Sequence, residues 1–127
     1  MNSNNQPVIL VVDDIKTNIV LVQVLLRGKN YEVLSAQSGV QALKIAEERK
    51  PDIIILDLMM PVMDGYEVLA RLRANEATKD IKIIVLSALA KSEDIKRAMS
   101  LGADDFLTKP IVAPKFFEVL NKLTGSL

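Results

Sequence analysis

Apolar residues follow two alternating patterns along the chain. Short runs rich in valine, isoleucine and leucine, such as VILVV at 8–12 and DIIIL at 52–56, are typical of parallel strands covered on both faces. Between these runs, apolar residues recur at the three-to-four-residue spacing of one helix face. The pattern predicts five strands, at 8–12, 32–36, 52–56, 82–86 and 105–107, and five helices, at 16–27, 39–49, 65–73, 92–101 and 114–123.

The alternation of strands and helices predicts one doubly wound α/β domain with right-handed crossovers. This domain is expected to occupy residues 8–124, with short tails at 1–7 and 125–127. In the last helix, the residues at positions i, i+3, i+4 and i+7 are expected to face the sheet; they are Phe116, Val119, Leu120 and Leu123. In such sheets ligands bind beyond the carboxyl ends of the strands, where the strand order reverses.

Polar side chains stand at several of these carboxyl ends. Asp13 and Asp14 follow the first strand, Asp57 the third, Ser87 the fourth and Lys109 the fifth. If the first and third strands are neighbours, about 4.8 Å apart, the three carboxylates share one small pocket. Like charges so close together are unfavourable alone, but they suit a hard divalent cation. The sequence therefore predicts a magnesium site.

Each of these residues also has an ordinary structural explanation. Asp14 could cap the helix that begins near residue 16, and Asp64 in the PVMDG turn could cap the following helix. Asp57 could be an ordinary carboxylate at the end of a strand, Ser87 a turn residue, and Lys109 a solvated loop lysine. A functional site is favoured because three acids, a hydroxyl and a lysine all fall at the carboxyl ends of four strands, the first, third, fourth and fifth.

The composition of the chain excludes several kinds of site. Its 127 residues, 50% of them apolar, are enough for one substantial core. The absence of cysteine excludes disulfides and suits a cytoplasmic protein, and the absence of histidine excludes serine–histidine triads and histidine-bound zinc. The 16 basic residues balance 16 acidic ones, which gives no reason to expect nucleic acid or a membrane as partner. The short apolar runs and the polar start predict neither a membrane span nor a signal peptide.

Four motifs carry a family resemblance: VVDD, ILDLMMPVMDG, VLSA and DDFLTKP. In this order and spacing the chain resembles, over essentially its whole length, the receiver domain of bacterial two-component response regulators. The resemblance implies a flavodoxin-like sheet of order 2-1-3-4-5 with helices on both faces. It also implies that Asp57 accepts a phosphoryl group from the phosphohistidine of a histidine kinase or a histidine phosphotransfer protein. The donor must be another protein, because this chain has no histidine.

The resemblance also assigns the metal ligands. Asp14, Asp57 and the main-chain carbonyl of Met59 are expected to bind Mg²⁺ directly, and Asp13 largely through water. Asp57 itself is the expected nucleophile. The two adjacent aspartates after the first strand would then hold the metal that makes a third aspartate reactive.

Further roles follow from the same resemblance. Lys109 is expected to contact an oxygen of Asp57 and later the phosphoryl group, and its peptide bond to Pro110 is expected to be cis. Ser87 would donate a hydrogen bond to the phosphoryl group and, with Phe106 on the fifth strand, form the switch. Phenylalanine at this position lacks the hydroxyl of the tyrosine that is frequent in the family.

The expected output surface comprises the fourth helix, the fifth strand and the fifth helix. Its candidate exposed members are Lys91, Asp94, Arg97, Lys115 and Glu118. A downstream effector protein or domain would bind there, and the chain is expected to be a monomer or a weak, phosphorylation-dependent dimer. Either a complete single-domain regulator or a receiver from a hybrid kinase, diguanylate cyclase or other larger protein fits this sequence.

A small phosphatase of the haloacid dehalogenase type is the main rival. Such enzymes also combine a strand-end aspartate, a hydroxyl, a lysine and acidic magnesium ligands. Their general acid is an aspartate two residues after the nucleophile, where this chain has Met59, and the chain has no room for a substrate-selecting cap. A degenerate receiver that only binds partners is the second rival. We expect a signalling phosphoacceptor that catalyses its own phosphoryl transfer and slow dephosphorylation, not a metabolic enzyme.

The lifetime of the phosphorylated state depends on access of water to phosphorus. The side chains two residues after Asp57 and two after Ser87, Met59 and Leu89, are expected to flank the approach of that water. Neither can orient a water molecule by hydrogen bonding. The sequence therefore predicts slow dephosphorylation.

Overall fold

The computed structural model describes residues 6–88 and 91–125 and contains one five-stranded parallel sheet. The strands are β1 (Val8–Val12), β2 (Glu32–Ala36), β3 (Ile53–Asp57), β4 (Lys82–Ser87) and β5 (Asp105–Thr108). Their order in the sheet is β2-β1-β3-β4-β5, which confirms the expected topology. Relative to the sequence prediction β3 lies one residue later, so Asp57 is the last residue of the strand.

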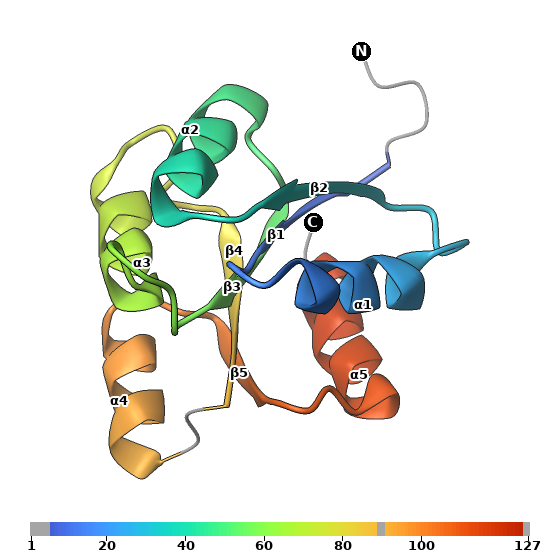
Figure 1. The fold of residues 1–127 in the computed structure, drawn as a ribbon. Helices are drawn as coiled ribbons and strands as arrows, with labels where there is room; N and C mark the ends of the chain where they lie inside the picture. Colours follow the sequence, from blue (N-terminus) through green and yellow to red (C-terminus); the bar gives the residue numbers. More distant parts are fainter. Residues whose placement is uncertain (1–5, 89–90, 126–127) are drawn as a thin grey trace.

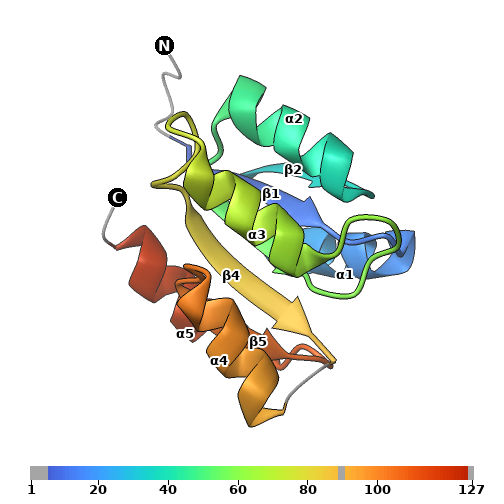
Figure 2. The same cartoon turned by 90° about the vertical axis from the view of Figure 1, so that its left-hand side faces the viewer.

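Five helices cover the two faces of this sheet. They are α1 (Lys16–Leu26), α2 (Gly39–Arg49), α3 (Gly65–Ala74), α4 (Ser92–Ser100) and α5 (Ala113–Thr124). Figures 1 and 2 show α1 and α5 on one face and α2, α3 and α4 on the other. Because both faces are covered, the strands need apolar side chains on both sides, which explains the nearly continuous apolar runs.

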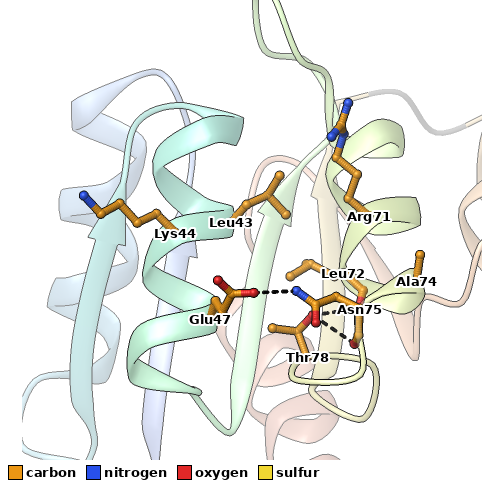
Figure 3. A pocket seen from close by; sticks show the side chains of 8 residues that line it. All are labelled: Leu43, Lys44, Glu47, Arg71, Leu72, Ala74, Asn75 and Thr78. Carbon is orange, nitrogen blue, oxygen red and sulfur yellow. Dashed lines mark hydrogen bonds between the residues drawn. The ribbon is translucent and has the colours of Figure 1, made fainter.

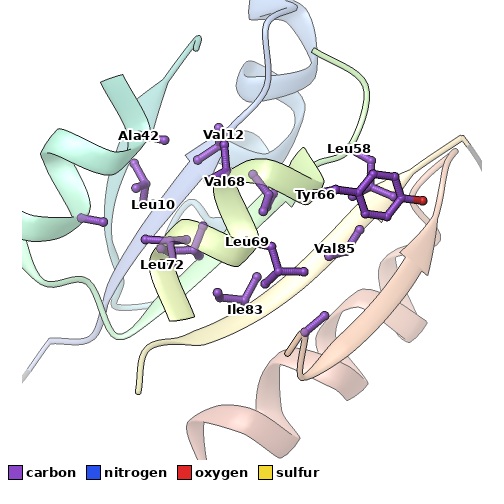
Figure 4. Close-up of a cluster of buried hydrophobic side chains, with 14 of the residues drawn as sticks. Leu10, Val12, Ala42, Leu58, Tyr66, Val68, Leu69, Leu72, Ile83 and Val85 are labelled. Carbon is purple, nitrogen blue, oxygen red and sulfur yellow. The ribbon is translucent and has the colours of Figure 1, made fainter. Parts of the chain in front are cut away.

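Alternate residues of each strand contribute to two separate cores. Side chains such as Leu10, Ile54 and Val85 pack under α2, α3 and α4, in the cluster drawn in Figure 4. Their neighbours in sequence, such as Ile9 and Ile55, pack against α1 and α5. The four residues of α5 that were expected to face the sheet are all buried: Phe116, Val119, Leu120 and Leu123.

The starts of the helices differ in how they are capped. Asp64 caps α3 by accepting a hydrogen bond from the amide of Glu67 at 3.0 Å, as expected. The alternative role of Asp14 as the cap of α1 is wrong: Ile15 occupies that position, and no side chain among the described residues caps the helix. The amide of Ile15 instead donates to Oδ1 of Asp13 at 2.9 Å. Asp14 is thereby left for another role.

The sheet already involves the end of the expected N-terminal tail, since the carbonyl of Pro7 accepts a hydrogen bond from the amide of Glu32 at 3.0 Å. Leu89, expected near the site, lies outside the described residues. Within residues 6–88 and 91–125, none of the helices has the length and apolar character needed to cross a membrane.

Candidate functional site

The candidate site lies at the carboxyl edge of the sheet, where β1 and β3 are neighbours. Val12 pairs with Leu56, so the residues that follow, Asp13 and Asp57, come side by side. Each of Asp13, Asp14 and Asp57 offers a carboxylate oxygen, and these oxygens all lie within 4.8 Å of one another. Asp13 and Asp57 are only 3% and 4% exposed. The three acids that the sequence singled out therefore form one cluster at the topological switch point.

The ammonium group of Lys109 lies in this cluster. Nζ of Lys109 donates to Oδ2 of Asp13 at 3.0 Å and lies 3.6 Å from Oδ2 of Asp57. The main-chain amide of Met59 donates to Oδ1 of Asp57 at 3.3 Å. Oδ1 of Asp14 is buried and has no hydrogen-bond partner among the described residues. Asp13 and Asp57 thus share the ammonium group of Lys109, and the third carboxylate, that of Asp14, keeps an oxygen without a hydrogen-bond partner among the described residues.

The electrostatics of the cluster are unfavourable to ionised Asp57. Burial raises the pKa of Asp57, and the nearby carboxylate of Asp13 raises it further, while Lys109 acts in the opposite direction. A divalent cation would relieve this repulsion and give the unpartnered oxygen of Asp14 a ligand role. The donor set consists of oxygens only, which is what Mg²⁺ prefers. The residues present therefore fit a magnesium ion.

Ser87 and Lys109 reach the same edge from β4 and β5. Ser87 is fully buried at the end of β4, next to β3 in the sheet. The amide of Lys109 donates to the carbonyl of Ser87 at 2.9 Å, which ties the two loops together. The Lys109–Pro110 peptide bond is cis. Phe106, the other expected switch residue, is half-buried and packs against the core cluster under α2, α3 and α4.

Gly65, which the sequence pattern identified only as the start of a helix, packs against the backbone of the candidate site. Its amide donates to the carbonyl of Leu58 at 2.9 Å, so the first residue of α3 rests on the backbone just after Asp57. A Cβ at this position would lie 2.6 Å from the Cα of Leu58 and would also clash with the carbonyl oxygen of Asp57. The Asp-Gly pair in the turn was the only sequence signal for this close approach.

Two pockets lie beside the helices and loops around the site. One, of about 380 Å³, opens beside Lys109 and is lined on its other side by Asn18 and Leu21 of α1. The other lies between α2 and α3 (Figure 3). Two of its polar groups pair within it: Asn75 donates to Glu47 at 2.8 Å, and Thr78 donates to the carbonyl of Leu72 at 2.7 Å. Neither pocket brings three carboxylates together, as the aspartate cluster does.

The sequence matches the family model of the response regulator receiver domain over residues 9–121. The response regulator PleD of Caulobacter vibrioides is 42% identical over 116 residues, which are 91% of this chain and 26% of PleD. The polar-differentiation response regulator DivK of Brucella ovis is 32% identical over 117 residues, which are 92% of this chain and 95% of DivK. The chain thus spans about a quarter of the length of PleD and nearly all of DivK.

A similar arrangement is found in a solved structure, the receiver domain of the sensor histidine kinase PA1611 from Pseudomonas aeruginosa PAO1. That domain has a magnesium ion coordinated in its active site cleft. It matches this structure with a TM-score of 0.86 and 32% identity, over 94% of this chain and 98% of that one. The family model, the relatives and the strand order agree, and the chain belongs to the response regulator receiver domain family.

Proposed function

We propose that residues 8–124 accept a phosphoryl group on Asp57 from the phosphohistidine of a histidine kinase or a histidine phosphotransfer protein. One observation carries the proposal: the buried carboxylate of Asp57 lies within 4.8 Å of those of Asp13 and Asp14, with the ammonium group of Lys109 beside them. A phosphoryl acceptor needs a positioned nucleophile and charges that neutralise the transferred oxygens. This cluster supplies both.

In the proposed reaction an oxygen of the Asp57 carboxylate attacks phosphorus. The bond between phosphorus and the donor imidazole breaks, the imidazole keeps the electron pair, and Asp57 becomes an acyl phosphate. Lys109, now paired mainly with Asp13 at 3.0 Å, would move its ammonium onto an oxygen of the phosphoryl group. Ser87 would donate its hydroxyl to a second oxygen. The chain catalyses this transfer on itself and acts on no metabolite.

Mg²⁺ is the proposed cofactor. Asp14, Asp57 and the main-chain carbonyl of Met59 would hold it directly, and Asp13 through water. The ion would neutralise negative charge that builds up on the transferred oxygens. Support comes from the unpartnered buried oxygen of Asp14 and from the related PA1611 domain, which coordinates magnesium.

The proposed output is a change of the surface formed by α4, β5 and α5. Phosphorylation adds about −1.5 to −2 charges, which would draw Ser87 and its loop inward and allow Phe106 to turn. Lys91, Arg97, Lys115 and Glu118 of this surface are exposed, whereas Asp94, which was also expected to be exposed, is half-buried. A downstream protein or domain would read the change, by binding a monomer or a weak, phosphorylation-dependent dimer.

The test is incubation of the chain with acetyl phosphate and Mg²⁺, followed by intact-mass measurement. One added phosphoryl group is expected in the wild type and none in Asp57→Asn. Asp52→Asn is the matched control, because Asp52 precedes the same strand at the opposite edge and pairs with the amide of Val8 at 2.8 Å. Full labelling of Asp57→Asn, or none of the wild type, would contradict the proposal.

The metal is tested separately through thermal stability. Mg²⁺ should raise the melting temperature of the wild type, because it binds the folded cluster and not the unfolded chain. Asp14→Ala should lose most of this response and should label poorly with acetyl phosphate. An Mg²⁺ response in Asp14→Ala equal to that of the wild type would place the metal elsewhere.

A further inference from the structure

The helix α4 is attached to the domain by few buried side chains. Ala98 is its one fully buried residue among those the structure describes, and Ile95 is half-buried. Figures 1 and 2 show α4 beside α3 on the same face of the sheet. A helix with so little buried surface depends on a few specific contacts for its position.

Tyr66 of α3 makes such contacts. Its side chain is only 8% exposed and lies at the rim of the core cluster, where Figure 4 shows the hydroxyl directed away from the other labelled side chains. The hydroxyl donates to Oδ1 of Asp94 in α4 at 3.3 Å. The guanidinium carbon of Arg97, one turn further along α4, lies 3.9 Å from the centroid of the tyrosine ring. We call these three residues the α3–α4 clasp.

The clasp needs both parts of the tyrosine side chain. The ring face attracts the guanidinium of Arg97 through a cation–π interaction, and the hydroxyl anchors Asp94. Burial raises the pKa of the Tyr66 hydroxyl, and Asp94 raises it further, so the hydroxyl keeps its proton and remains a donor. The pairing also explains why Asp94 is half-buried although it lies on a charged helix face.

Tyr66 also lies next to the residue of α3 that contacts the backbone at Asp57. It directly follows Gly65, whose amide donates to the carbonyl of Leu58 and whose α-carbon leaves no space for a side chain against the backbone of Asp57 and Leu58. A displacement of the backbone at Asp57 therefore displaces the start of α3. The clasp lies one residue from that point.

From this geometry we propose that Tyr66 is a positioning residue that couples the Asp57 site to α4. It would hold α4 in one position in the unphosphorylated chain and transmit changes at Asp57 to the helix. This inference rests on the proposed phosphorylation of Asp57. It adds a route through α3 to the one through Ser87 and Phe106.

The experiment is amide hydrogen exchange of residues 92–100 in the full chain, compared between Tyr66→Phe and the wild type. Loss of the hydroxyl should speed exchange in α4 about fivefold, as expected for the loss of one hydrogen bond. Tyr31→Phe is the matched control: Tyr31, the other of the 2 tyrosines, is half-buried and packs on the opposite face of the sheet. The exchange rate of α4 in Tyr31→Phe should equal that in the wild type.

Phosphorylation provides the readout that a purely structural role would not change. Acetyl phosphate with Mg²⁺ should alter exchange in residues 92–100 of the wild type, and this response should fall to less than half in Tyr66→Phe at equal phosphate incorporation. Asp94→Asn, which keeps an acceptor oxygen, should behave like the wild type, and Asp94→Ala like Tyr66→Phe. Two results would overturn the coupling. One is a change in α4 exchange on phosphorylation that is as large in Tyr66→Phe as in the wild type. The other is an α4 exchange rate in unphosphorylated Tyr66→Phe equal to that of the wild type.

If the proposed phosphorylation of Asp57 is wrong, the experiments give a different result from the one expected if only the coupling through Tyr66 is wrong. If the wild type takes up no phosphoryl group, Asp57 is not the acceptor. The comparison of unphosphorylated Tyr66→Phe with Tyr31→Phe still shows whether the clasp holds α4. The α4 response to Mg²⁺ alone then tests the coupling, and an equal response in both variants would overturn it.

Discussion

The carboxylate of Asp57 is held where burial and Asp13 both oppose its negative charge. Its pKa is raised above the ordinary value of 3.8, so the folded chain binds this proton more readily than the unfolded chain. Ionisation of Asp57 therefore destabilises the metal-free fold. The loss of stability develops as the pH rises from about 3.8 through the raised pKa.

We accordingly predict that Asp57→Asn melts at a higher temperature than the wild type at pH 7 in the presence of a chelator. The advantage should shrink as the pH falls below the pKa of Asp57, because the wild-type carboxyl is then neutral as well. Thermal unfolding followed by circular dichroism measures both. A metal-free Asp57→Asn variant that is less stable than the wild type at pH 7 would contradict the prediction.

Met59 is predicted to prolong the phosphorylated state. It is 55% exposed next to Asp57, and its thioether cannot orient an attacking water molecule. Met59→Asn together with Leu89→Glu should speed dephosphorylation about tenfold or more, which corresponds to about 1.4 kcal/mol of barrier. First-order loss of the phosphoryl group in Mg²⁺ measures this rate.

The matched control for that measurement is Met99→Asn on α4, where the side chain is 43% exposed and far along the chain from the cluster. It should lose phosphate at the wild-type rate. Equal rates in the wild type and the Met59 and Leu89 double variant would show that water reaches phosphorus by another route.

At the scale of elements, the contact between α3 and β3 is the most restrictive. A Cβ on Gly65 would meet the backbone of Asp57 and Leu58, which cannot move without displacing the carboxylate of Asp57. Gly65→Ala is predicted to destabilise the fold by about 1–3 kcal/mol and to slow phosphorylation of Asp57. Urea unfolding and the rate of labelling by acetyl phosphate measure the two effects.

Gly39 at the start of α2 is the appropriate control for this substitution. A Cβ there would lie 2.9 Å from Sδ of Met63 and from Cγ2 of Val68, which are side-chain atoms and not the backbone at Asp57. Gly39→Ala should therefore leave the rate of labelling close to that of the wild type. A Gly65→Ala variant that labels as fast as Gly39→Ala would show that the close approach does not position Asp57.

The sequence patterns did not predict the exact end of one strand or the exposure of one helix residue. The periodicity identified all five helices, but β3 ends one residue later than predicted because hydrogen-bond pairing with β4 continues through Asp57. The charge pattern of α4 suggested an exposed Asp94, yet Tyr66 from another helix covers it. Both differences come from partners that are distant in the sequence.

At the scale of the molecule, Arg73 connects three segments. Its guanidinium donates to the carbonyls of Lys79, Ile81 and Gly102 at 2.6 to 2.9 Å and to Oδ2 of Asp104 at 3.0 Å. It thus joins the end of α3 to the loop before β4 and to the loop after α4. A lysine has one ammonium group and cannot reproduce this planar set of donors.

Arg73→Lys is predicted to lower the free energy of unfolding by about 2–4 kcal/mol, because several acceptors lose their donor. Arg71→Lys, two residues earlier on the same helix, is the control. Arg71 is exposed and pairs with Glu67 one turn away, so its replacement should change stability by no more than about 0.5 kcal/mol. Urea unfolding of both variants provides the measurement, and equal effects would contradict the role of Arg73.

The sequence by itself determined the fold class and which side chains lie together at the carboxyl edge of the sheet. Apolar periodicity depends only on local spacing, and the carboxyl ends of parallel strands must lie at one edge, so Asp13, Asp57 and Ser87 could be grouped without coordinates.

Only the tertiary structure decided which groups touch. Four features depend on distances between separate elements. They are the unpartnered oxygen of Asp14, the shorter distance of Lys109 to Asp13 than to Asp57, the contact of Gly65 with the end of β3 and the clasp at Tyr66. Such distances are set when helices pack on the sheet, and no local pattern in the chain encodes them.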